Sequence, residues 1–118
     1  LYAQKRANFG PFQDWWEACL IEELVLGYDL AEEWPSQITK KEFRACFERW
    51  TKMKGKVYPY QKNLPSREQI GRDINKYLPD IQESKINKDH SYKLPSLEKS
   101  REAWENHHKV KIEWERCK

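Results

Sequence analysis

The stretch Leu64–Leu78, LPSREQIGRDINKYL, predicts a short helix with two unlike faces. Ser66 is suited to cap the first turn, with Gln69 three residues later, and Pro79 stops the helix. At about 100° per residue, one arc collects the apolar side chains that a globular core needs, Ile70, Ile74, Tyr77 and Leu78. The opposite side carries Gln69, Arg72 and Lys76, with Asn75 at one edge.

The polar face of this helix suits contact with a polyanion. Arg, Gln, Asn and Lys are the side chains that read base edges or hold phosphates. Arg67, in the first turn, is placed for a backbone phosphate, as are the N–H groups at that helix end. Because a solvated helix face carries the same residue types, this helix alone leaves both interpretations open.

The segments around this helix are also regular. Periodic apolar residues predict a helix from about Phe12 to Leu26, stopped by Gly27. Thr39 and Glu42 form a capping box for a second helix, which runs to about Lys54. Residues 80–94 indicate a hairpin with a basic tip, and Pro95–Ser96 opens a last helix to about His108. Alternation over residues 110–114 favours a short strand.

Helix, helix, helix and hairpin is the element order of a winged helix, in which the third helix enters the major groove and the hairpin contacts phosphate. We therefore expect a mainly α fold with a small β-hairpin. Residues 1–11 are interpreted as a linker or N-terminal arm, and residues 12–118 as a single winged-helix-like DNA-binding domain. The connection over residues 56–64 is longer than the tight turn of a simple helix-turn-helix.

Charge is distributed unevenly along the chain. Residues 37–95 hold 14 basic and seven acidic residues, whereas residues 1–36 hold two basic and seven acidic ones. Such asymmetry indicates a directed electrostatic surface, although ordinary surface charge remains the alternative. Tyr58, Tyr60 and Tyr92 are candidates for stacking on single-stranded bases. The candidate nucleic-acid-binding residues are Arg67, Gln69, Arg72, Asn75, Lys76, Lys85 and Lys88.

The remaining chemistry argues against an enzyme. Three Cys residues without a CxxC pair indicate a reducing compartment, hence the cytoplasm, and Cys19 and Cys46 are expected in the core. No His or Cys stands at metal-ligand spacing, and no glycine-rich phosphate loop occurs, so we expect no metal, cofactor or catalytic site. The longest apolar run is broken by Glu22 and Glu23, which excludes a membrane span.

Two parts of the chain resemble the C-terminal region of phage and plasmid helicase-primases. One is Phe12…Trp16…Cys19–Leu20 followed by Ile38–Thr39–Lys40, Phe43 and Trp50. The other is Leu94-Pro95-Ser96-Leu97-Glu98…Arg101…Trp104-Glu105…Ile112-Glu113-Trp114. These proteins are poxvirus-type, superfamily 3 helicases, including phage primase-polymerases. The resemblance spans about residues 12–114.

The resemblance implies a winged-helix domain that follows an ATPase motor and helps to grip DNA, duplex or single-stranded. The family's recognition positions fall on Gln69, Arg72, Asn75 and Lys76, but its Walker lysine has no counterpart in this chain. Glu68 and Asp73 reduce the basicity of the helix, which fits a tethered accessory domain. The expected location is the cytoplasm, which is that of the host cell if the protein is phage-encoded. The alternative is a protein–protein interaction or oligomerisation module of the same machinery, in which an acidic first helix meets the basic middle of another subunit.

Overall fold

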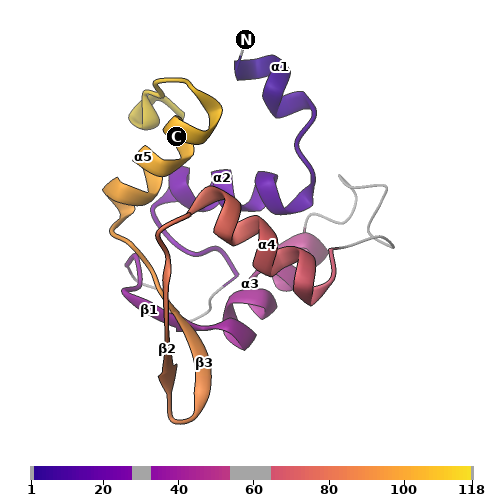
Figure 1. Cartoon of the computed structure of the whole chain (residues 1–118). Coiled ribbons are helices and arrows are strands. Elements are labelled where there is room, and N and C mark those ends of the chain that lie inside the picture. The colour runs from indigo at the N-terminus through magenta and orange to yellow at the C-terminus, as the bar shows by residue number, and fades with distance from the viewer. Residues whose placement is uncertain (1, 28–32, 54–64, 118) are drawn as a thin grey trace.

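The computed structural model of the chain describes residues 2–27, 33–53 and 65–117. Figure 1 shows a mainly helical protein with a small antiparallel sheet, which confirms the expected mainly α class. In chain order the elements are α1 (Tyr2–Ala7), α2 (Pro11–Glu22), β1 (Gln37–Thr39), α3 (Lys40–Met53), α4 (Arg67–Tyr77), β2 (Gln82–Ile86), β3 (Asp89–Lys93), α5 (Leu97–His108) and the 3₁₀ turn η2 (Trp114–Cys117).

The predicted hairpin is present, and a third strand joins it. The sheet order is β1-β3-β2, and Tyr92 in the central strand β3 pairs with Ile38 on one side and Glu83 on the other. The sequence does not predict the strand β1, because three residues are too few to show an alternating pattern. At the hairpin tip, Asn87 and Lys88 both have positive φ, 49° and 75°, as a tight two-residue turn requires.

One aromatic core joins the helices to the sheet. Trp15 of α2 packs against Phe43 of α3 with ring centroids 5.0 Å apart, and Phe43 in turn meets Tyr92 of β3 at 5.4 Å. The apolar faces of α2, α3 and α4 supply much of this core, and Cys19 and Cys46 are buried in it as expected. Large rings supply most of this buried area, which is how a chain of low mean hydropathy keeps a core.

Helix α2 ends earlier than its periodicity predicts. Glu23 adopts a left-handed conformation (φ 64°) and closes the helix there, rather than Gly27. Gly27 has a positive φ of 92°, which glycine adopts without strain. A Cβ at this position would also lie 2.2 Å from the carbonyl oxygen of Cys46. The glycine therefore lets the segment after α2 pass directly against the backbone of α3.

Both ends of the chain differ from expectation. Within residues 1–11, interpreted from sequence as a linker or arm, Tyr2–Ala7 form the helix α1, and Tyr2 packs on the core. The strand predicted over residues 110–114 is wrong. There the backbone N–H of Ile112 donates to the Glu105 carboxylate at 2.7 Å, and the 3₁₀ turn η2 follows. The backbone N–H of Val110 donates to the Glu105 carbonyl of α5 at 3.1 Å, and Trp114 is buried with the Arg101 guanidinium 5.1 Å from its ring centroid.

Candidate nucleic-acid interface

Helix α4 turns one face inward and leaves the other outside. Its first turn is capped by Ser66, whose hydroxyl accepts a hydrogen bond from the backbone N–H of Gln69 at 3.2 Å. Ile70, Ile74 and Tyr77 are buried, as the sequence predicts. Gln13 of α2 donates a hydrogen bond to the Tyr77 hydroxyl. These contacts fix the rotation of α4, so the polar side chains opposite the core face solvent.

The outer face of α4 carries four of the predicted residues. Arg72, Asn75 and Lys76 are exposed, and Gln69 is half-buried. Arg72 donates to the Gln69 side-chain oxygen at 2.8 Å, and Gln69 donates to Asp73 at 2.9 Å. This chain of hydrogen bonds orients the Arg72 guanidinium, while the Asp73 carboxylate lowers the local positive potential.

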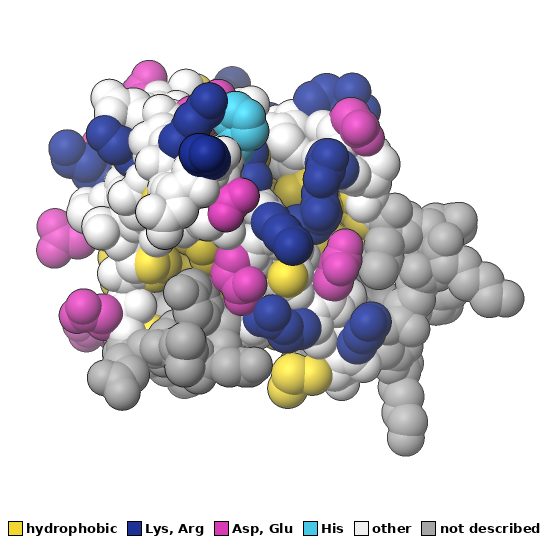
Figure 2. Space-filling view, turned by 90° about the horizontal axis from the view of Figure 1, so that it is seen from below, with side chains coloured by type: hydrophobic (Ala, Val, Ile, Leu, Met, Phe, Trp, Pro, Cys, Tyr) yellow, Lys and Arg dark blue, Asp and Glu magenta, His cyan; other side chains and the backbone are white. Residues whose placement is uncertain are grey.

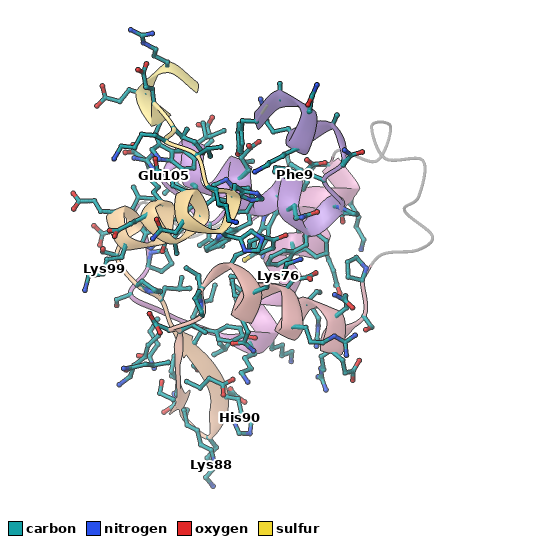
Figure 3. All side chains as sticks on the ribbon, turned by 45° about the horizontal axis from the view of Figure 1, so that its top comes forward. Phe9, Lys76, Lys88, His90, Lys99 and Glu105 are labelled. Atoms are coloured by element: carbon teal, nitrogen blue, oxygen red, sulfur yellow. The ribbon has the colours of Figure 1, made fainter. Side chains whose placement is uncertain are left out.

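The hairpin brings two further predicted residues to its exposed side. Lys85 lies in β2 and Lys88 in the turn, and both are exposed. Figure 3 shows Lys88 and His90 at the tip of the hairpin, pointing away from the body of the protein, whereas Lys76 lies beside α4 near α5. The hairpin therefore extends its cations well beyond the helix layer.

Arg67 belongs to a different surface from the rest of α4. It lines a groove of about 470 Å³ between the beginnings of α3, α4 and β3. Three more cations line the same groove, Lys40, Lys41 and Arg44 of α3, and sequence reasoning did not assign them to the site. The sequence does contain a signal for these three cations: they lie close together in the first turns of one helix, so their positive charges gather at that end of α3. Only the folded chain shows that Arg67 lies beside it.

Lys76 borders a second, larger hollow. This cavity of about 690 Å³ lies between the end of α4, the sheet and α5, and Lys93, Lys99 and His107 also line it. The pKa of His107 is lowered by desolvation and by the nearby charges of Lys76 and Lys5. His107 is thus held neutral beside the lysines, and the positive charge at this end of α4 comes from ammonium groups.

Acidic side chains are interspersed among these cations. Lys40 forms an ion pair with Glu83, and Arg44 lies 4.0 Å from Glu48. Figure 2, viewed from the hairpin end, shows Lys and Arg side chains gathered on this face with Asp and Glu side chains among them. The surface is basic but mixed, as Glu68 and Asp73 indicated in the sequence.

Some carboxylates of α2 and of the residue that follows it are engaged in contacts within the protein. Glu17 is only 5% exposed and accepts hydrogen bonds from Arg6, at 3.0 Å, and from Tyr2. Glu23, just after the helix, lies 3.7 Å from the Arg101 guanidinium. Fewer carboxylates are therefore left to meet a basic partner than the sequence alone indicates.

Three tyrosines are predicted from the sequence to stack on single-stranded bases. Tyr58 and Tyr60 lie outside the described residues, and Tyr92 is 5% exposed with the Lys40 ammonium over its ring, 5.2 Å from the centroid. In the described ranges no group of His, Cys, Asp and Glu is arranged to hold a metal ion. No helix among those residues has the length and apolar character needed to cross a membrane.

No protein-family model, no curated protein and no solved structure matches the chain.

Proposed function

We propose that this chain is a winged-helix DNA-binding domain with α4 as the recognition helix and the β2–β3 hairpin as the wing. One observation carries the proposal: the element order α2-β1-α3-α4-β2-β3, with a sheet ordered β1-β3-β2. A winged helix has this order, with a short strand before its second helix closing the sheet against the hairpin. The polar outer face of α4 and the lysines of the hairpin support the proposal, because a winged helix contacts DNA through its third helix and its hairpin.

We further propose that the domain is an accessory part of a phage-type helicase-primase or primase-polymerase, working in the cytoplasm and gripping DNA near the motor. The sequence resemblance supports this context. The mixed charge supports a tethered role, because Asp73 and Glu48 offset some of the cations and a neighbouring motor would supply the remaining affinity. An oligomerisation module is the alternative, but the internal pairing of Glu17 and Glu23 leaves it less support.

Electrostatics gives the proposal a measurable consequence. Arg72, Lys76, Lys85 and Lys88 are the charged members of the predicted interface that lie on α4's outer face and the hairpin. Each phosphate contact releases condensed counterions, so the logarithm of the binding constant should fall against the logarithm of salt with a slope of about −0.9 per contact. Four contacts predict a slope of about −3.6.

Fluorescence anisotropy of labelled duplex and single-stranded DNA, titrated with the 118-residue chain across a range of salt concentrations, tests the proposal. Arg72→Ala combined with Lys76→Ala should weaken binding and reduce the slope by about 1.8, without unfolding the protein, because both side chains are exposed. Lys109→Gln with Lys111→Gln removes the same charge near the end of α5 and should change neither quantity appreciably.

Absence of binding at low salt, both to this chain and to a longer protein containing it, would overturn the proposal. Light scattering on the same samples addresses the alternative. A stable oligomer without DNA affinity would favour the interaction module, whereas a monomer that binds DNA would exclude it.

A further inference from the structure

The groove beside Arg67 is a second basic surface, separate from the outer face of α4. It lies where the first turns of α3 and α4 meet the beginning of β3, and its volume of about 470 Å³ is within the range of small-ligand sites. Its floor is apolar, with Ile70 and Tyr92 at the surface of the core. Its rim is cationic, and the four cations come from two helices: Lys40, Lys41, Arg44 and Arg67.

The rim has positive charge to offer an anion. Asp89 is the one acidic residue among the groove's described lining residues. Across the described part of the chain, Lys41 and Arg67 form no ion pair. Lys40 and Arg44 do pair with acids outside the groove, but the Glu83 and Glu48 side chains are 57% and 51% exposed. Exposed pairs of this kind are weak, so both cations are free to turn toward a phosphate.

Gly71 leaves the floor open. It lines the groove in the middle of α4, where a Cβ would meet nothing within 4 Å. Neither a tight turn nor a close approach of another backbone requires glycine here, and glycine weakens a helix interior. The missing side chain instead gives a flat ligand access to the backbone of α4 next to Ile70.

We infer that this groove holds one unpaired nucleotide of the nucleic acid that the chain binds. The phosphate lies among Lys41, Arg44 and Arg67, and the base packs on the apolar floor over Gly71 and Ile70. A nucleotide has a flat base and, a short distance away, a negative phosphate. The base matches the apolar floor of the groove, and the phosphate matches its cationic rim. This inference rests on the proposed function, and it adds that the domain prefers DNA with a single-stranded end or gap to blunt duplex.

The test compares two labelled DNAs, a blunt duplex and the same duplex with a short single-stranded overhang, by anisotropy with the full 118-residue chain. We expect the wild-type protein to bind the overhang several-fold more tightly. Gly71→Leu fills the groove without altering charge, and leucine favours the helix. It should abolish the preference for the overhang and leave blunt-duplex affinity unchanged. Gly71→Ala fills little space and should retain most of the preference, while Lys41→Ala with Arg67→Ala should lose it.

Thymidine monophosphate provides a readout that does not require DNA binding. In amide NMR spectra it should shift the signals of Ile70 and Gly71 in the wild-type protein and not those of the same segment in Gly71→Leu. Equal binding of both DNAs by the wild-type protein, or an overhang preference that survives in folded Gly71→Leu, would overturn the inference. Shifts with the mononucleotide but no binding of any DNA would instead overturn the proposed function while supporting the nucleotide site. Absence of shifts would count against the groove alone.

Discussion

The indole Nε1 of Trp104 donates a hydrogen bond to the hydroxyl of Tyr2, 2.8 Å away, and so joins α5 to α1 across most of the chain. The Tyr2 hydroxyl donates in turn to the buried carboxylate of Glu17. Burial, and then the hydrogen bond to Glu17, raise the pKa of Tyr2, which keeps the hydroxyl protonated and able to donate. The first helix is therefore part of the core's polar network.

Tyr2→Phe should destabilise the fold. The change removes the acceptor of Trp104 and one donor to Glu17, leaving buried polar groups without those partners, at a cost of about 1–3 kcal/mol. Urea denaturation followed by tryptophan fluorescence measures the free energy of unfolding. Gln4→Ala, at an exposed position of the same helix, should change it by less than about 0.5 kcal/mol. Equal stability of Tyr2→Phe and wild type would contradict the network.

Gly27 and Gly71 should respond in opposite ways to alanine. At Gly27 the new Cβ would meet the carbonyl of Cys46 at 2.2 Å in a left-handed backbone conformation, which predicts a loss of about 2–5 kcal/mol. At Gly71 the Cβ enters open space inside a helix, which predicts a gain of up to about 1 kcal/mol. Thermal melting by circular dichroism compares the two, and a tolerant Gly27 would show that the close approach to α3 relaxes easily.

His108 should make stability depend on pH. Burial, His107 and two lysines lower its pKa from 6.5 to about 4. Between these values the unfolded chain binds a proton that the folded chain refuses, so stability is complete above pH 6.5 and falls as pH drops toward 4. His108→Phe, which keeps an aromatic ring beside Trp104, should reduce the difference in unfolding free energy between pH 7 and pH 4.5 by about 1–2 kcal/mol. An unchanged difference would show that His108 does not contribute.

A glycine at the hairpin tip should raise the stability of the fold and weaken DNA binding. Lys88 holds φ 75° in the turn, a conformation that glycine adopts without strain. Lys88→Gly should therefore raise the free energy of unfolding by about 1 kcal/mol. It should also weaken DNA binding and reduce the salt slope by about 0.9. Lys88→Ala is the control, since it removes the same charge and keeps the strain. Stronger binding by Lys88→Gly would refute a phosphate contact at the tip.

Local signals predicted much of this fold. The caps at Ser66, Ser96 and Thr39 and the apolar faces of α3 and α4 are short-range features that the structure confirms. The Glu42 carboxylate, expected to complete a capping box with Thr39, accepts a hydrogen bond from Arg49 at 2.9 Å. Features set by distant contacts could not be predicted. Strand β1 exists because Gln37–Thr39 meet β3, and α1 is held by Trp104 and Glu17.

The candidate site followed the same rule. The outward face of α4 could be predicted from its period, and its exposure is confirmed, whereas its DNA contacts stay a prediction. The groove could not be predicted, because Lys41 and Arg67 are neighbours only after α3 and α4 pack together. Where a surface combines side chains from separate elements, periodicity along one element gives no indication of it.

The pairing of α1 with α5 has a practical consequence for attachment. Figure 1 shows both helices at the end of the molecule opposite the hairpin tip. A fluorophore, tether or fusion partner joined near Tyr2 or beyond α5 would therefore stand clear of the wing. Single-molecule measurements that anchor the protein at either end should present the hairpin and the outer face of α4 outward to DNA in solution.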